Sequence, residues 1–191
     1  AVILLVDLSR STANAVNGSE LRVLDVEKQA IVLLCEALNV IGDRFAIAGF
    51  SGTGPLGVDY FSIKDLEESF DDSVKGRIGA MTPQRSTRMG AAIRHATALL
   101  APVQARVRLI VVLGDGFPND LEYKGPYAVE DTRRAVMEAR AEAIHVKGIT
   151  VNVSDNQQLD QLYGPTHHTV IGDVRDLPDR LVRVYSDLTR H

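Results

Sequence analysis

The feature that most constrains this chain is a pair of nearly continuous apolar runs, each of strand length and each followed by an aspartate. Residues 1–6 read AVILLV and precede Asp7, and residues 107–113 read VRLIVVL and precede Gly114 and Asp115. Strands that are apolar at almost every position are typical of parallel sheets whose two faces are both covered by helices. The two runs therefore predict an α/β fold built on a central sheet.

The rest of the chain alternates between helix and strand patterns. Helices are predicted over residues 26–40, 88–100, 129–143, 157–163 and 176–188, with one or two short helices within 65–80. Further strands are predicted over residues 44–50, 58–63, 146–153 and 168–171, and a loop over 117–126. Asp25 is the predicted N-cap of the first long helix, and Gly42 closes it. This alternation predicts a mostly parallel sheet with helices on both faces.

Size and charge narrow the possible functions. A chain of 191 residues with 45% hydrophobic residues has enough apolar side chains for one core, so we expect a single domain over residues 1–191. Because the chain starts inside its first strand, we expect it to be the excised C-terminal part of a longer protein.

A net charge of −4 argues against nucleic-acid binding, and no stretch is long enough to enter a membrane. The single cysteine, Cys35, is predicted to be buried. Without a second cysteine the chain cannot form an internal disulfide, which fits a reducing cytoplasm.

Five oxygen-bearing side chains follow the two apolar runs or start a helix. Asp7, Ser9 and Ser11 occupy alternate positions after the first run, so in an extended segment their side chains would point the same way. Asp115 follows the second run, and Thr87 comes directly before the helix at 88–100. In parallel sheets, sites form beyond the carboxyl ends of the strands. Carboxylate and hydroxyl oxygens are hard ligands, which suit Mg²⁺ or Mn²⁺ and suit zinc or copper poorly.

The order of these residues resembles the metal-ion-dependent adhesion site of von Willebrand factor A (VWA) domains. That site has D-x-S-x-S after the first strand, a Thr before a helix, and the Asp of a later D-G. The resemblance implies an open, mostly parallel, Rossmann-like sheet with helices on both faces and one short antiparallel edge strand. It also implies that the serines and the threonine coordinate the metal through hydroxyls, while the aspartates act directly or through water. Gly114 stands where many VWA domains have Thr, at a position that is not a ligand.

Four further segments are similar to the C-terminal domain of the NorD/CbbO proteins. They are LDVEK at 24–28, GDRFAI at 42–47, STRMGAAIRHA at 86–96 and EDTRRAV at 130–136. Proteins of that family are partners of MoxR-type AAA+ ATPases and help to activate nitric oxide reductase or rubisco. The resemblance implies that the adhesion site grips a client protein while the ATPase supplies force.

Two classes of function are open. In the first, the domain is a non-enzymatic adaptor whose Mg²⁺ binds an Asp or Glu of a client protein. The alternative is an Mg²⁺-dependent hydrolase that uses the same cluster to activate water. We favour the adaptor, because no base or activated nucleophile is evident beside Asp7 or Asp115.

Three arginines flank the predicted ligands. Arg10 lies between the two serines, and Arg85 and Arg88 lie on either side of the threonine. In an acidic chain they could form a positive rim that attracts an acidic client to the metal. With equal weight, they could pair with nearby acids such as Asp59 or Glu122 or simply lie in solvent.

Overall fold

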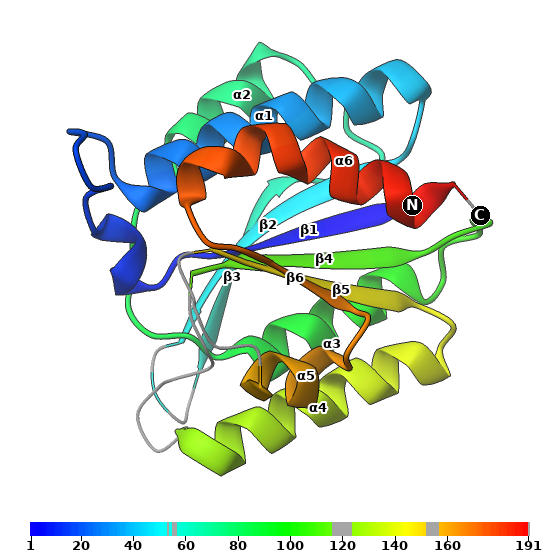
Figure 1. Ribbon diagram of the computed structural model, residues 1–191. Coiled ribbons are helices and arrows are strands. Elements are labelled where there is room, and N and C mark those ends of the chain that lie inside the picture. Colours follow the sequence, from blue (N-terminus) through cyan, green and yellow to red (C-terminus); the bar gives the residue numbers. More distant parts are fainter. Residues whose placement is uncertain (53, 55–56, 116–123, 152–156, 191) are drawn as a thin grey trace.

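The computed structural model describes residues 1–52, 54, 57–115, 124–151 and 157–190, which fold around a six-stranded sheet of order β3-β2-β1-β4-β5-β6 (Figure 1). The strands are β1 (Val2–Asp7), β2 (Phe45–Gly52), β3 (Val58–Lys64), β4 (Leu109–Gly114), β5 (His145–Val151) and β6 (His168–Ile171). Neighbouring strands are parallel except for β2 and β3, which pair antiparallel at one edge. The predicted fold class is therefore confirmed.

Helices cover both faces of the sheet (Figure 1). One face carries α1 (Val23–Ile41), α2 (Asp72–Gly79) and α6 (Leu177–Thr189), and the other carries α3 (Met89–Leu100), α4 (Gly125–Ala141) and α5 (Gln157–Tyr163). Side chains of β1 alternate between the two cores: Leu4 and Val6 pack toward α1, whereas Ile3 and Leu5 pack toward α3. This double burial is the physical reason for the continuous apolar run. Cys35 is fully buried in the first core, as predicted.

The start of α1 differs from its prediction. Asp25 is not the N-cap; that position belongs to Arg22, and Asp25 is the third residue of the helix. The Asp25 carboxylate accepts a hydrogen bond of 2.8 Å from the backbone N–H of Arg22, so it caps the helix from inside. At the other end Gly42 has a φ of 78° and closes the helix, as predicted.

The predicted loop at 117–126 and the predicted strand at 146–153 are only partly described. Residues 117–123, 152 and 153 lie outside the described residues. The end of the predicted loop is wrong, because α4 already begins at Gly125 and has Pro126 in its first turn. Proline suits that position, since the first helical N–H groups have no partner within the helix.

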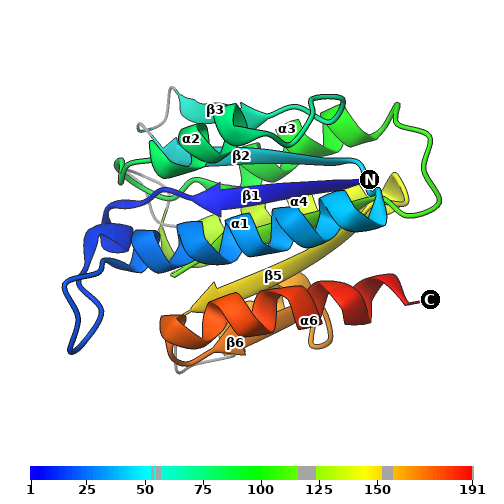
Figure 2. The ribbon, with the colours of Figure 1, turned by 90° about the horizontal axis from the view of Figure 1, so that it is seen from above.

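The sheet order positions a site between β1 and β4. From β1 the chain adds β2 and β3 on one side, and it then adds β4, β5 and β6 on the other. The carboxyl ends of β1 and β4 lie side by side where the order reverses, the position typical of binding sites in open α/β sheets. A short 3₁₀ helix, η1 (Arg10–Ala13), follows β1 there, and the first turns of α1 lie next to it (Figure 2). The two marked chain ends lie at the opposite end of the sheet (Figure 1).

Candidate functional site

Asp7, the last residue of β1, is the most deeply buried member of the site. It has no exposed surface, and its carboxylate accepts a hydrogen bond of 2.8 Å from the backbone N–H of Ser9. The buried hydroxyl of Thr87 lies 3.4 and 3.3 Å from the two carboxylate oxygens and donates to them. The end of the central strand therefore presents a carboxylate that is fixed by neighbours on two sides.

The two serines reach the site through a helical turn. The alternating, extended geometry predicted for residues 7–11 is wrong, because Ser11 lies within η1 and Ser9 is the N-cap of that turn. The Thr12 hydroxyl donates to the Ser9 carbonyl at 2.7 Å and so stabilises the turn. The hydroxyl oxygens of Ser9 and Ser11 nevertheless lie 3.0 Å apart. The turn therefore brings the two hydroxyls together, as an extended segment was expected to do.

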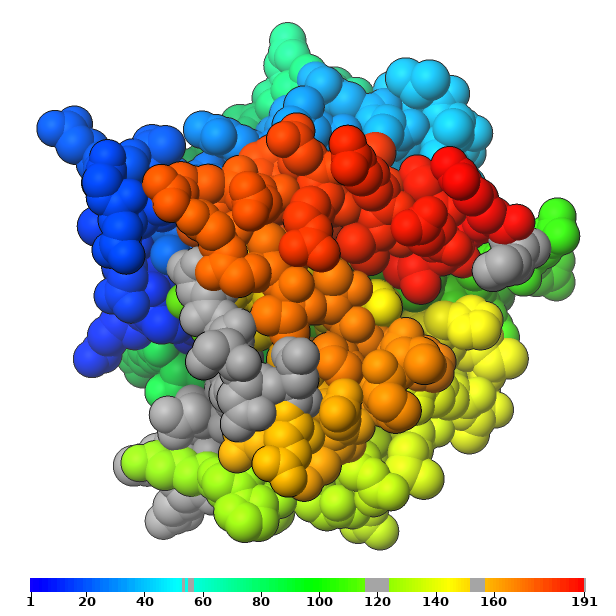
Figure 3. Space-filling model, in the orientation of Figure 1, coloured from blue at the N-terminus to red at the C-terminus, as the bar shows by residue number. Residues whose placement is uncertain are grey.

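Asp115 completes the cluster from the neighbouring strand. It is the first residue after β4, it is half-buried, and its carboxylate accepts a hydrogen bond of 2.8 Å from the Ser11 hydroxyl. The structure therefore brings all five predicted ligands together at the carboxyl ends of β1 and β4. In Figure 3 the segment that includes η1 forms the left margin of the visible face, so this end of the molecule is at the surface.

The Thr87 segment is attached to both neighbouring parts of the site. The backbone N–H of Arg10 donates to the carbonyl of Arg85 at 3.0 Å, and the N–H of Arg85 donates to the Ser51 hydroxyl at 3.0 Å. An isolated bridge also pairs Ser86 with Gly52 at the end of β2. These bonds hold the segment before α3 against η1 and against the sheet.

Gly114 is not among the predicted ligands, but it lies against the side chain of one of them, Asp7. A Cβ atom placed on it would lie 3.1 Å from the Cβ of Asp7 and 3.2 Å from the Oδ2 of Asp7. The glycine thus leaves room for the Asp7 carboxylate beside β4.

Negative charge in the site is not balanced within the cluster. Burial, together with the nearby charge of Asp115, raises the pKa of Asp7 to about 7, although hydrogen bonds from Ser9 and Thr87 oppose the shift. Burial also raises the pKa of Asp115, against the hydrogen bond from Ser11. Buried acids shift upward in this way when their charged form lacks a counter-ion. An oxygen-only cluster with uncompensated carboxylates fits a hard divalent cation.

The structure adds a third acid, Glu27, which the sequence pattern does not predict. It lies on α1, it has no exposed surface, and neither carboxylate oxygen has a hydrogen-bond partner within the described structure. Burial raises its pKa well above the usual range, and the charges of Asp115 and Asp7 add to the shift. A signal was present in the sequence, because Glu27 falls on the apolar stripe of the helix, one turn from Leu24 and one turn from Ile31.

The acidic side chains of this cluster could not hold a metal ion by themselves. No group of three His, Cys, Asp or Glu side chains is placed to hold one ion directly, within the part of the chain that the structure describes. A cation at this end of the sheet would therefore need hydroxyl or water ligands beside the two aspartates. The hydroxyls of Ser11 and Thr87 hydrogen-bond to the two aspartates, and that of Ser9 lies next to Ser11.

The arginine rim is only partly described. Arg10 and Arg85 are exposed, and neither makes an ion pair with a described residue, so the pairing with Asp59 is not seen. Arg88 is half-buried and is the N-cap residue of α3. The alternative partner Glu122 lies outside the described residues. The rim stays a prediction.

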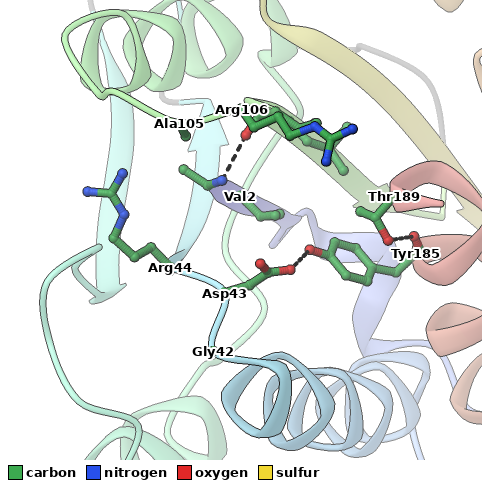
Figure 4. A pocket seen from close by; sticks show the side chains of 11 residues that line it. Val2, Gly42, Asp43, Arg44, Ala105, Arg106, Tyr185 and Thr189 are labelled. Carbon is green, nitrogen blue, oxygen red and sulfur yellow. Dashed lines mark hydrogen bonds between the residues drawn. The ribbon is translucent and has the colours of Figure 1, made fainter. Parts of the chain in front are cut away.

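A separate pocket of about 320 Å³ lies at the opposite end of the sheet (Figure 4). Ala1, Arg44 and Arg106 are among the residues that line it, and the Tyr185 hydroxyl donates to the Asp43 carboxylate there. The acid in this pocket is already engaged, and the pocket lies far from the carboxyl ends of the strands. It has no part in the Asp7 cluster.

Comparison with known families identifies the class of protein. The von Willebrand factor type A domain family matches residues 1–181, and the chain belongs to that family. Solved structures with under 25% identity share the fold. BatB from Bacteroides thetaiotaomicron has a TM-score of 0.65 and 18% identity, over 100% of this chain and 98% of that one. Manganese-loaded TRAP protein from Plasmodium vivax has a TM-score of 0.65 and 16% identity, over 96% of this chain and 70% of that one.

Relatives with higher identity include proteins named NorD. Protein NorD of Brucella suis is 42% identical over 186 residues, which are 97% of this chain and 29% of the relative. An uncharacterised protein of Pseudomonas aeruginosa is 39% identical over 191 residues, which are 100% of this chain and 31% of the relative. The chain spans about three tenths of the length of these relatives. Among the described residues, no helix is both long and apolar enough to span a membrane.

Proposed function

We propose that this VWA domain is a metal-dependent protein-binding adaptor. It would hold Mg²⁺, with Mn²⁺ as a substitute, through five side chains: Asp7, Ser9, Ser11, Thr87 and Asp115. The observation that carries the proposal is the convergence of two carboxylates and three hydroxyls at the ends of two adjacent strands. Here the hydroxyls donate to the carboxylates or to one another. A cation would take over these contacts and supply the missing positive charge.

The chemistry of the ion suits capture of an acidic side chain. Mg²⁺ keeps water at the positions that the protein does not fill, and a carboxylate can displace one of those waters. The inner side of the site is closed by buried Asp7 and Thr87, whereas Ser11 is exposed and Asp115 is half-buried. We therefore propose that an Asp or Glu of a client protein completes the coordination sphere from the Ser11 side.

The client and the partner machine are proposed from similarity. Since the chain is 42% identical to a protein named NorD over 97% of its length, we propose that its parent protein works with a MoxR-type AAA+ ATPase. The clients proposed are nitric oxide reductase or rubisco, with the domain acting in the cytoplasm. The domain would grip the client while the ATPase remodels it.

Hydrolysis is the alternative function, and no observation favours it. The hydrogen bond from the Ser11 hydroxyl to Asp115 could be taken for a nucleophile beside its base, but two ligands of one metal ion would also lie this close. An activated nucleophile normally also has a third group that orients the base. We retain the binding role.

The first prediction is that the 191-residue domain binds Mg²⁺ or Mn²⁺ saturably and that Asp7→Asn or Ser9→Ala weakens binding. Either change removes an oxygen ligand or its charge, so we expect a loss of at least about tenfold in affinity. Isothermal titration calorimetry measures the affinity, and circular dichroism checks that each variant keeps the fold.

Matched controls for these variants lie on α2. Asp72→Asn and Ser73→Ala make the same chemical changes at exposed positions away from the site, and both should bind like wild type. Unchanged metal affinity in a folded Asp7→Asn protein would contradict the ligand assignment.

A further inference from the structure

Glu27 is a buried acid without a visible reason. It is 0% exposed, it lies on the second turn of α1, and neither of its carboxylate oxygens has a hydrogen-bond partner among the described residues. A buried charge with no partner is strongly unfavourable. Protonation would remove the charge, but the new O–H group would then lack an acceptor. Glu27 is therefore costly to the described structure in either form.

The position of α1 explains what Glu27 faces. The first turns of α1 lie next to η1 at the carboxyl end of β1 (Figure 2). Apart from burial, the groups that act on Glu27 most are Asp115 and Asp7, which both repel its negative charge. The three carboxyl groups are thus close enough for their charges to repel one another, and a cation would relieve this repulsion for all three.

Direct ligation by Glu27 does not fit the geometry. Within the described residues no three acidic, histidine or cysteine side chains are placed to hold one ion together. Mg²⁺, however, keeps part of its water shell when it binds to proteins. Carboxylates that accept hydrogen bonds from such ligands orient them and strengthen metal binding.

We propose that Glu27 is a third carboxylate of the cation site, acting through water: it accepts hydrogen bonds from water molecules bound to the divalent cation from the inner side of the site. This inference rests on the proposed function, because it needs a cation at the Asp7 cluster. It adds a residue that lies outside the D-x-S-x-S, Thr and D-G pattern. Glu27 would orient water on the buried side of the ion, behind Asp7 and Thr87, and the exposed side would stay free for a client.

The test uses Glu27→Gln, which keeps size and removes the charge. We expect Mg²⁺ affinity, measured by calorimetry on the 191-residue domain, to fall about ten- to a hundredfold. Without metal, the variant should unfold at a higher temperature than wild type at neutral pH, because an acid whose pKa is raised by folding lowers stability above its unfolded pKa, and Gln does not titrate. Saturating Mg²⁺ should then raise the unfolding temperature less in the variant than in wild type. A merely structural role for Glu27 would not produce these opposite effects.

Two further variants keep the result interpretable. Glu27→Met fills similar space without a polar group and replaces Glu27→Gln if the latter does not fold; the same loss of affinity is expected. Glu36→Gln is the matched control, since Glu36 is on the same helix but is exposed and paired with Lys75 at 3.2 Å. It should bind Mg²⁺ like wild type.

The outcomes separate this inference from the proposed function. If wild type binds neither Mg²⁺ nor Mn²⁺, the proposed function fails and the role of Glu27 fails with it. If Asp7→Asn loses metal binding while a folded Glu27 variant keeps wild-type affinity, only the role of Glu27 is overturned.

Discussion

Two exposed arginines lie beside the proposed ligands. Arg10 is adjacent to Ser9 and Ser11 in the chain, and its backbone N–H donates to the Arg85 carbonyl at 3.0 Å, so the backbones of both arginines meet at this edge. Exposed charges act on an approaching partner over about 10 Å at ordinary salt. On the proposed function, the charges of these two side chains would attract an acidic client without binding the ion.

We predict that Arg85→Glu slows capture of the acidic client by the parent protein and leaves Mg²⁺ affinity unchanged. At low salt the association rate should fall about tenfold, and the difference should shrink as salt rises, because mobile ions screen the attraction. Stopped-flow or surface plasmon resonance kinetics provide the measurement. Arg106→Glu is the control, since Arg106 is exposed at the opposite end of the sheet.

Two results would contradict this view of the rim and the metal. Equal association rates for wild type and Arg85→Glu at low salt would show that the rim does not steer the client. Capture that persists in EDTA would show that no metal bridge is needed.

At the scale of single elements, one tight contact fixes α5 against the sheet and against α3. On β5, Gly148 lies directly under the ring of Tyr163 from α5, and a Cβ on Gly148 would lie 2.3 Å from a ring carbon. Tyr163 is 2% exposed, and its hydroxyl donates to the sulfur of Met89 on α3 at 3.2 Å. The ring therefore has no room to move away, and it connects α5 to α3 and to the sheet.

We predict that Gly148→Ala lowers the free energy of unfolding by about 2 kcal/mol or more, since overpacking a rigid core forces backbone shifts. Urea unfolding followed by circular dichroism measures the change. Gly76→Ala on α2 is the matched control: its Cβ would meet open space, and alanine favours the helix by about 0.5–1 kcal/mol. A Gly148→Ala protein as stable as wild type would show that the α5 layer is loosely packed.

The elements differ in how well their sequence predicts them. β1 and β4 are predictable because burial on both faces makes almost every residue apolar. The start of α1 is not, because Arg22 is an unusual N-cap and the capping carboxylate of Asp25 comes from inside the helix. The start of α4 comes earlier than the sequence predicts, because proline is typical of loops but also suits a first helical turn, where Pro126 lies.

The candidate site also has parts that the sequence predicts and parts that it does not. Its five predicted ligands follow strands or precede a helix, so the sheet topology alone brings them together. The path between Asp7 and Ser11 was predicted wrongly, because a 3₁₀ turn and an extended segment can both place the two serines near each other. Glu27 was missed because an acid on an apolar stripe looks like an exception until its burial is known.

For the molecule as a whole, the proposed site joins the buried central strand β1 to the largely exposed turn η1. β1 is hydrogen-bonded to β2 and to β4, so its amides should exchange with solvent only through global unfolding. η1 is a four-residue turn at the surface, and its amides should exchange through local opening. A cation held by Asp7 and Ser11 would couple the two regions.

We predict that Mg²⁺ at ten times its dissociation constant slows amide exchange in η1 about tenfold, since opening of the turn would require release of the ion. Hydrogen exchange followed by NMR gives this residue by residue. The last turn of α6, which lies away from the site, serves as the internal control and should not change. Equal exchange of η1 with and without Mg²⁺ would mean that the ion, if bound, does not depend on Ser11.

The central place of β1 also has a mechanical consequence. Asp7 is the last residue of this strand, and backbone hydrogen bonds join β1 to β2 on one side and to β4 on the other. A pull on Asp7 along the strand axis would load these bonds together, in shear, rather than one after another as in unzipping. A client attached at this end would therefore pull against many backbone hydrogen bonds of the sheet at the same time.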